Sequence, residues 1–115
     1  MSYCQDGIHV KFTTETLQNT YFSSMYGYYE LDPIEVNGRP YFKNGAYGIW
    51  WNGIDYWCIG QDSMKGQTLG FAFYEKDVFC PHQLAESEWW LFDGTDWYAA
   101  NGDLVITCKC NFILT

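Results

Sequence analysis

Two aspartates beside tryptophans, Asp55 and Asp96, are the residues of this sequence whose type and setting could support acid–base chemistry. Glycosidases cleave their substrates with a pair of carboxylates roughly 5 to 9.5 Å apart, one acting as acid and the other as base or nucleophile. Each aspartate, however, stands two positions after a glycine in a turn-like Asx-Gly sequence, where carboxylates are common. Turn chemistry therefore accounts for both residues more simply than catalysis does.

Nucleophilic and metal-assisted chemistry are not indicated either. The sequence contains no Gly-x-Ser-x-Gly, no His-Glu-x-x-His, no Asp-x-Asp-x-Asp-Gly calcium loop and no Cys-x-x-Cys pair. Cys80 and His82 supply a thiol and a base, but Pro81 holds them apart and a disulfide would remove the nucleophile. We predict that the protein is not an enzyme and binds no metal or cofactor.

Aromatic residues make up 21% of the chain, with 6 Trp, 10 Tyr and 8 Phe. Such rings have a flat apolar face that suits the C–H surface of a sugar ring, while nearby polar groups accept its hydroxyl hydrogens. The sequence therefore predicts a carbohydrate-binding, lectin-like module. The predicted ligand-binding residues are Trp50, Trp57, Trp90 and Trp97, with Asp55 and Asp96 as polar partners.

A second function class uses the same residues. Buried Trp and Tyr are the usual hot spots of protein–protein contacts, so the rings would equally serve a protein-interaction module. They would also suit a structural or adhesive module without a small ligand, in which the rings fill both faces of a thin sheet. The sequence leaves these alternatives open.

The charge balance excludes two classes of partner. The chain has 6 Lys and Arg against 14 Asp and Glu, a net charge of −8 and a pI of about 4.4. Phosphate contacts need a basic surface, so nucleic acids and anionic membrane surfaces are disfavoured. No stretch of about 20 apolar residues is present, so we expect no membrane insertion.

Five cysteines in 115 residues favour a disulfide framework and hence an extracellular, secreted protein. We predict a Cys58–Cys80 bridge and a Cys4–Cys108 bridge, with Cys110 left over. Cys108 and Cys110 share one face of the last predicted strand, so they do not bond easily to each other. A bond from Cys108 to the residue preceding the first strand would fasten the two ends of a module together.

Two aromatic hairpins stand out among the predicted elements. One turns at Asn52-Gly53 between residues 47–51 and 56–60, and we predict a type I′ turn there because Asn and Gly tolerate positive φ. The other turns at Asp93-Gly94. Both read Asx-Gly-x-Asp followed by two aromatic residues, which suggests a weak internal duplication.

Turn signals recur along the chain between runs of about 4 to 7 strand-forming residues, and no long amphipathic helix is visible. We predict an all-β fold, an antiparallel meander forming a small sandwich or barrel. Its helical content is expected to be at most one short turn, at 81–88. A chain of this length forms one domain, 1–115, with 61–68 as a surface loop and 13–24 unassigned.

Several of these motifs together resemble a Trp- and Tyr-rich β-module of secreted, multidomain invertebrate and protist proteins. The resemblance covers most of the chain from Tyr28 onward. It implies an extracellular module and indicates no ligand. Its motifs are Tyr28-x-Glu30-Leu31, Asn37-Gly38-Arg39-Pro40-x-Phe42, Trp57-x-Ile59-Gly60, Trp90-x-x-x-Asp93-Gly94-x-x-Trp97 and Val105-x-x-Cys108.

Overall fold

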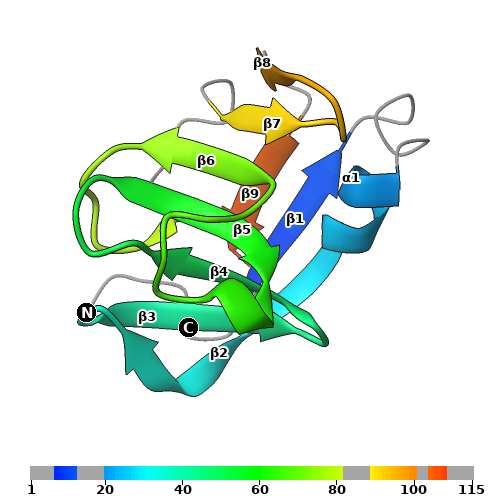
Figure 1. Cartoon of the computed structure of the whole chain (residues 1–115). Helices are drawn as coiled ribbons and strands as arrows, with labels where there is room; N and C mark the ends of the chain where they lie inside the picture. Colours follow the sequence, from blue (N-terminus) through cyan, green and yellow to red (C-terminus); the bar gives the residue numbers. More distant parts are fainter. Residues whose placement is uncertain (1–6, 13–19, 82–88, 101–103, 109–115) are drawn as a thin grey trace.

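The computed structural model describes residues 7–12, 20–81, 89–100 and 104–108, and their strands form a single antiparallel sheet curled into a half-barrel (Figure 1). The strand order is β8-β7-β6-β5-β4-β3-β2-β1-β9, so each strand from β1 to β8 pairs with the next. The predicted all-β antiparallel meander is therefore confirmed. The strands are β1 (Ile8–Phe12), β2 (Gly27–Val36), β3 (Arg39–Asn44), β4 (Tyr47–Trp51), β5 (Tyr56–Gln61), β6 (Ala72–Glu75), β7 (Trp90–Phe92), β8 (Trp97–Ala99) and β9 (Leu104–Cys108).

Two short helical pieces accompany the sheet. The six-residue helix α1 (Thr20–Met25) lies in the stretch that the sequence pattern left unassigned, and the 3-10 turn η2 (Asp62–Met64) follows β5. The helical turn expected at 81–88 falls almost entirely outside the described residues. None of the helices in the described segments has the length and apolar character needed to cross a lipid bilayer.

The tight turns are distributed differently from the prediction. Asn37 and Gly38, between β2 and β3, have φ of 54° and 79°, as a type I′ turn requires. The type I′ turn predicted at Asn52-Gly53 is wrong. Gly53 has a φ of 92°, but Asn52 lacks the positive φ that the turn would need. Among the described non-glycine residues, Asn37 alone has a positive φ. Trp51 pairs with Trp57, so a wider loop, 52–55, separates β4 from β5.

The main core fills the inside of the curled sheet, and every strand contributes to it, β8 through the half-buried Tyr98. A smaller cluster lies on the outer face and consists of Val36, Tyr41, Trp50 and Cys58. Residues 62–70, here called the covering loop, lie over this outer cluster, with Met64 packed against it. The central strands are therefore covered on both faces.

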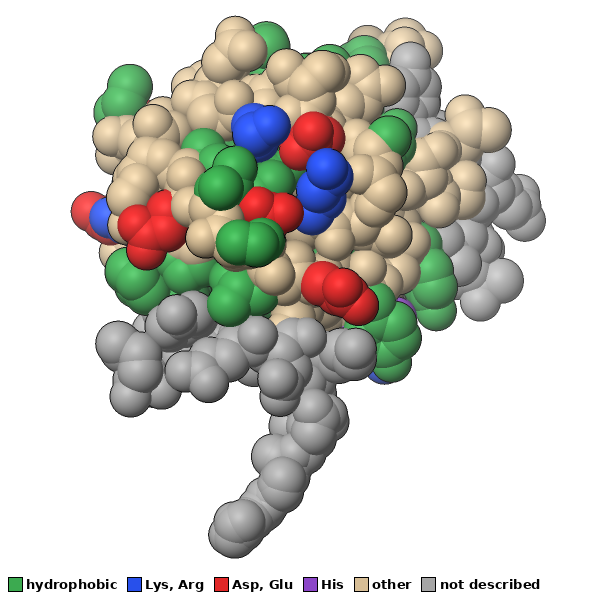
Figure 2. Space-filling model, turned by 90° about the horizontal axis from the view of Figure 1, so that it is seen from below, with side chains coloured by type: hydrophobic (Ala, Val, Ile, Leu, Met, Phe, Trp, Pro, Cys, Tyr) green, Lys and Arg blue, Asp and Glu red, His purple; other side chains and the backbone are tan. Residues whose placement is uncertain are grey.

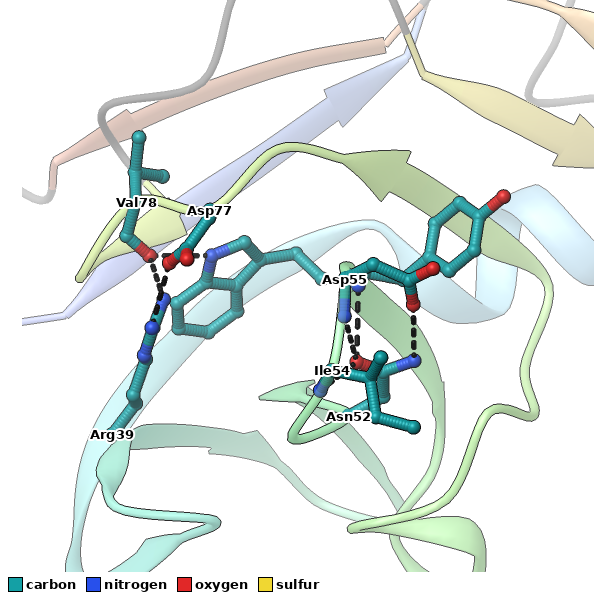
Figure 3. Close-up of polar contacts among 8 residues, drawn as sticks. Arg39, Asn52, Ile54, Asp55, Asp77 and Val78 are labelled. Atoms are coloured by element: carbon teal, nitrogen blue, oxygen red, sulfur yellow. Dashed lines mark hydrogen bonds and ion pairs between the residues drawn. The ribbon is translucent and has the colours of Figure 1, made fainter.

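The predicted Cys58–Cys80 disulfide is wrong, since Cys58 is a buried free thiol. Cys58 faces the outer cluster, where its Sγ lies 3.8 Å from the Gln67 carbonyl oxygen. The segment leading to Cys80 instead packs against the inner core through Val78. Arg39 holds this segment in place, since its Nη1 donates to the Val78 carbonyl at 2.7 Å (Figure 3).

The first and last strands of the described chain, β1 and β9, pair with each other in the sheet. β1 pairs with β9 as well as with β2, and Ile8 lies opposite Cys108. Cys4, Cys110 and the Cys108 side chain fall outside the described residues, so the Cys4–Cys108 bridge stays a prediction.

Candidate functional site

A row of neighbouring side chains crosses the outer face of the sheet from β4 to β7. Trp50 lies opposite Cys58, Cys58 opposite Phe73, and Phe73 opposite Trp90. Residues paired in this way project from the same face. The covering loop buries Trp50 and Cys58 completely, whereas Phe73 is half-buried and Trp90 is 49% exposed. The aromatic row thus emerges into solvent beyond the covering loop.

Four side chains at this point line a pocket of about 220 Å³, namely Tyr56, Phe73, Trp90 and Trp97, which we call the aromatic groove. The Trp97 ring stacks on Phe73, with 5.1 Å between ring centroids and 25° between planes. Phe92 packs against Trp97 at 5.2 Å, and Tyr56 against Phe73 at 5.6 Å. Mutual ring contacts of this kind hold the groove in shape while leaving 43% of Trp97 exposed.

Two side-chain-capped turns precede residues of the groove, one before Tyr56 and one before Trp97. Asn52 Oδ1 accepts the backbone N–H groups of the residues at 54, 55 and 56 at 2.9 to 3.0 Å (Figure 3). Asp93 Oδ1 accepts those of the residues at 95 and 96 at 2.8 Å. In both turns the next strand then starts with a ring on the outer face, Tyr56 in β5 and Trp97 in β8. The resemblance between the two hairpin sequences thus corresponds to a shared local structure.

Carboxylates surround the Tyr56 end of the groove. Glu75 lies directly opposite Tyr56 across β5 and β6 and is exposed. Its negative charge, followed by partial burial and the charge of Asp55, raises the pKa of the Tyr56 hydroxyl above its ordinary value. On the neighbouring turn, backbone N–H groups of Asp96 and Thr95 lower the pKa of Asp93. The rim of the groove is therefore acidic.

Two of the four predicted tryptophans do not belong to the surface. Trp90 and Trp97 come together in the groove, but Trp50 and Trp57 are fully buried, so predicting them as ligand-binding residues was wrong. Trp50 lies under the covering loop, where its Nε1 donates to the Gln67 carbonyl at 2.8 Å. Trp57 lies in the inner core and donates to the Val78 carbonyl at 2.9 Å.

The two predicted aspartates lie on the two capped turns. Asp55 is half-buried, and its Oδ1 accepts a hydrogen bond from Asn52 Nδ2 at 3.1 Å (Figure 3). Asp96 is exposed. Sequence reasoning missed Phe73, Glu75 and Tyr56. The position that Tyr56 shares with Trp97 in the two similar turns was a usable signal, whereas Phe73 and Glu75 enter the site only through the pairing of β6 with its neighbours.

Other polar clusters in the described part of the chain have structural partners of their own. Asp62 accepts a hydrogen bond from the Tyr41 hydroxyl and lies 3.5 Å from Lys65 Nζ and 3.8 Å from Lys43 Nζ. On the face shown in Figure 2, acidic and basic side chains are interspersed rather than gathered by sign. Within the described segments no three His, Cys, Asp or Glu side chains are grouped as a metal site would require.

The chain matches none of the protein-family models, curated proteins or solved structures with which it was compared. The aromatic groove is therefore the feature of the molecule that points to a function.

Proposed function

We propose that the protein is an extracellular carbohydrate-binding module and that the aromatic groove is its sugar site. The observation that carries this proposal is the half-exposed pair Trp90 and Trp97, held on one face of the sheet with Tyr56 and Phe73. Exposing the large apolar surface of a Trp side chain to water is unfavourable in free energy, so clustered exposed rings mark a contact surface. The exposed ring faces suit the C–H face of a sugar.

The size and rim of the groove fit a saccharide chain. Its volume of about 220 Å³ lies below the roughly 300 to 1,000 Å³ of pockets that enclose drug-sized ligands. One sugar unit resting on the rings, with its neighbours extending into solvent, fits such a site better than an enclosed molecule. The Tyr56 hydroxyl and the Glu75 carboxylate lie beside the rings to bond sugar hydroxyls.

The extracellular location in this proposal is supported by the module resemblance and by the cysteine content of the chain. Cys58 is a buried free thiol and does not contribute to that support. Cys4, Cys108 and Cys110 remain the residues that an oxidising compartment would pair.

Titration with an array of oligosaccharides, followed by Trp fluorescence, tests the proposal. We expect one sugar class to quench the emission. Trp90→Ala and Trp97→Ala should each weaken binding at least about tenfold, which corresponds to about 1.4 kcal/mol. Tyr28→Ala is the matched control, because Tyr28 is a half-exposed ring on β2, well separated from the groove in the strand order.

Absence of quenching across a broad array would contradict the sugar site and favour a protein contact at the same rings. Equal loss of binding in the Tyr28 control would contradict the assignment to the groove.

A further inference from the structure

Two acidic residues neighbour Tyr56 in the aromatic groove, Glu75 across the paired strands and Asp55 along the chain. Glu75 is its direct cross-strand partner, so both side chains project from the outer face of the sheet. Asp55 precedes Tyr56 and is held by the hydrogen bond from Asn52 Nδ2. The charge of Glu75, and after it burial and the charge of Asp55, raise the pKa of the Tyr56 hydroxyl.

The aromatic rings of the groove add to the negative electrostatic potential of these carboxylates. The face of an aromatic ring carries the negative end of its quadrupole, so cations are attracted to it, most strongly by Trp. Trp90 and Trp97 each have close to half of their side-chain surface in solvent. Ring faces and carboxylates therefore act in the same direction, attracting positive charge and repelling negative charge.

The basic residues near the groove do not cancel this field. The four lining residues are all aromatic and uncharged, and the whole chain carries a net charge of −8. Lys76, just beyond the end of β6, is a single positive charge against the carboxylates of Glu75 and Asp55. The turn at the other end adds the carboxylates of Asp93 and Asp96.

On the basis of the proposed sugar-binding function, we infer that the groove selects glycans whose sugars carry protonated amino groups. Glucosamine oligomers have the required chemistry: a sugar ring with an apolar C–H face for Trp90 or Trp97, and an ammonium group that reaches Glu75 and Asp55. The N-acetylated oligomers keep the ring face and lose the charge. Acidic glycans carry the opposite charge and are repelled.

The experiment compares three oligomers of equal length by Trp fluorescence titration in mildly acidic buffer, in which glucosamine amines are protonated. They are a β-1,4 glucosamine oligomer, its N-acetylated counterpart and an oligogalacturonate. We expect the glucosamine oligomer to bind at least about tenfold more tightly than the N-acetylated one, and the oligogalacturonate not to bind. The preference should shrink as salt is raised, because the charges involved are exposed to solvent.

Two charge-matched variants locate the effect. Glu75→Gln should reduce the preference for the glucosamine oligomer severalfold. Glu35→Gln removes the same charge from an exposed position on β2, which three strands separate from β6, and should leave the preference unchanged. Trp90→Ala should weaken binding of the glucosamine oligomer together with that of its N-acetylated counterpart.

Each contrary result has a distinct meaning. Equal affinity for the two glucosamine-based oligomers would overturn the charge selection while the sugar site stands. Equal effects of Glu75→Gln and Glu35→Gln, or tight binding that survives Trp90→Ala, would show attraction to the overall acidity of the protein and overturn the inference. Binding of no oligosaccharide of any class would overturn both the inference and the proposed function.

Discussion

At the scale of single residues, Asn52 does more to organise the site than the aspartates that follow it. It is a buried polar side chain, 7% exposed, and its Oδ1 accepts the three backbone N–H groups of residues 54–56. Its Nδ2 donates to Asp55 at 3.1 Å and to Thr68 Oγ1 at 2.8 Å. One amide thus ties the turn before Tyr56 to the covering loop.

Asn52→Ala should therefore destabilise the fold by about 2 to 4 kcal/mol, because several part-buried donors and acceptors lose their partner at once. Urea unfolding measures the change. Asp93→Ala is the matched control, since it removes the equivalent cap from the exposed 93–96 turn and should cost less. If the Asp93 variant were the less stable one, the organising role of Asn52 would be refuted.

The cysteine content of the chain predicts a disulfide at Cys58, but the residue is a buried free thiol. Burial raises the pKa of its thiol to about 12. Such a shift leaves on the order of one thiolate in ten thousand at pH 8. We expect Cys58 to resist iodoacetamide in the native protein and to react in urea, as read by peptide mass mapping. Rapid native alkylation, or a peptide linking Cys58 to Cys80, would show that the buried thiol is not the native form.

At the scale of elements, the hairpins are readable from the sequence, whereas the covered face of each strand is not. Asx-Gly pairs mark the turns because few residues adopt positive φ, and alternation assigns side chains to faces. Trp50 and Trp90 stand in similar aromatic runs, yet only Trp50 is covered. Trp50 and Asn37 hold the covering loop through the backbone carbonyls of Gln67 and Gly66, which any residue supplies, so these contacts leave no signal in the sequence of the loop.

The covering loop depends on a close approach of two glycines. Gly70 has a φ of 136°, and a Cβ there would lie 2.6 Å from the Ile59 carbonyl oxygen. Gly70→Ala should cost about 2 to 3 kcal/mol through backbone strain and collision, and should lift the loop from Trp50. Gly45→Ala is the control, because Gly45 has a φ of 59° with nothing within 4 Å of its Cβ position, and should cost about 1 kcal/mol.

Thermal melting with acrylamide quenching of Trp emission tests this. Gly70→Ala should raise the accessible fraction of Trp fluorescence and Gly45→Ala should not. Equal stability of both variants would mean that the loop does not need the glycine contact.

At the scale of the whole molecule, the curled sheet joins the first described strand to the last. β1 lies between β2 and β9, and the inner core draws on both ends of the described chain through residues such as Ile8 and Ile106. Loss of either end would expose core surface that every other strand helps to enclose. Folding is therefore expected to be cooperative. Protonation of a single side chain should then change the free energy of unfolding of the whole domain.

Stability should fall in two steps as the pH is lowered. His9, on β1, stacks on Tyr28 at 4.1 Å, and burial followed by the charge of Lys11 lowers its pKa below the ordinary 6.5. The folded state thus favours neutral His9, and the stability present above pH 6.5 is lost as the pH falls towards the folded-state pKa. The Tyr41 hydrogen bond, with Lys65 and Lys43 nearby, lowers the pKa of Asp62 below 3.8.

The second step follows from Asp62, whose contribution is present above pH 3.8 and disappears as the pH falls through its lowered folded-state pKa. Tm measured against pH should show both steps. His9→Gln should remove the upper step and Asp62→Asn the lower one. His82 is the other of the two histidines, so His82→Gln is the control and should leave the upper step in place. An upper step that survives His9→Gln and vanishes in the control would assign it to His82 and refute the role of the stacked imidazole.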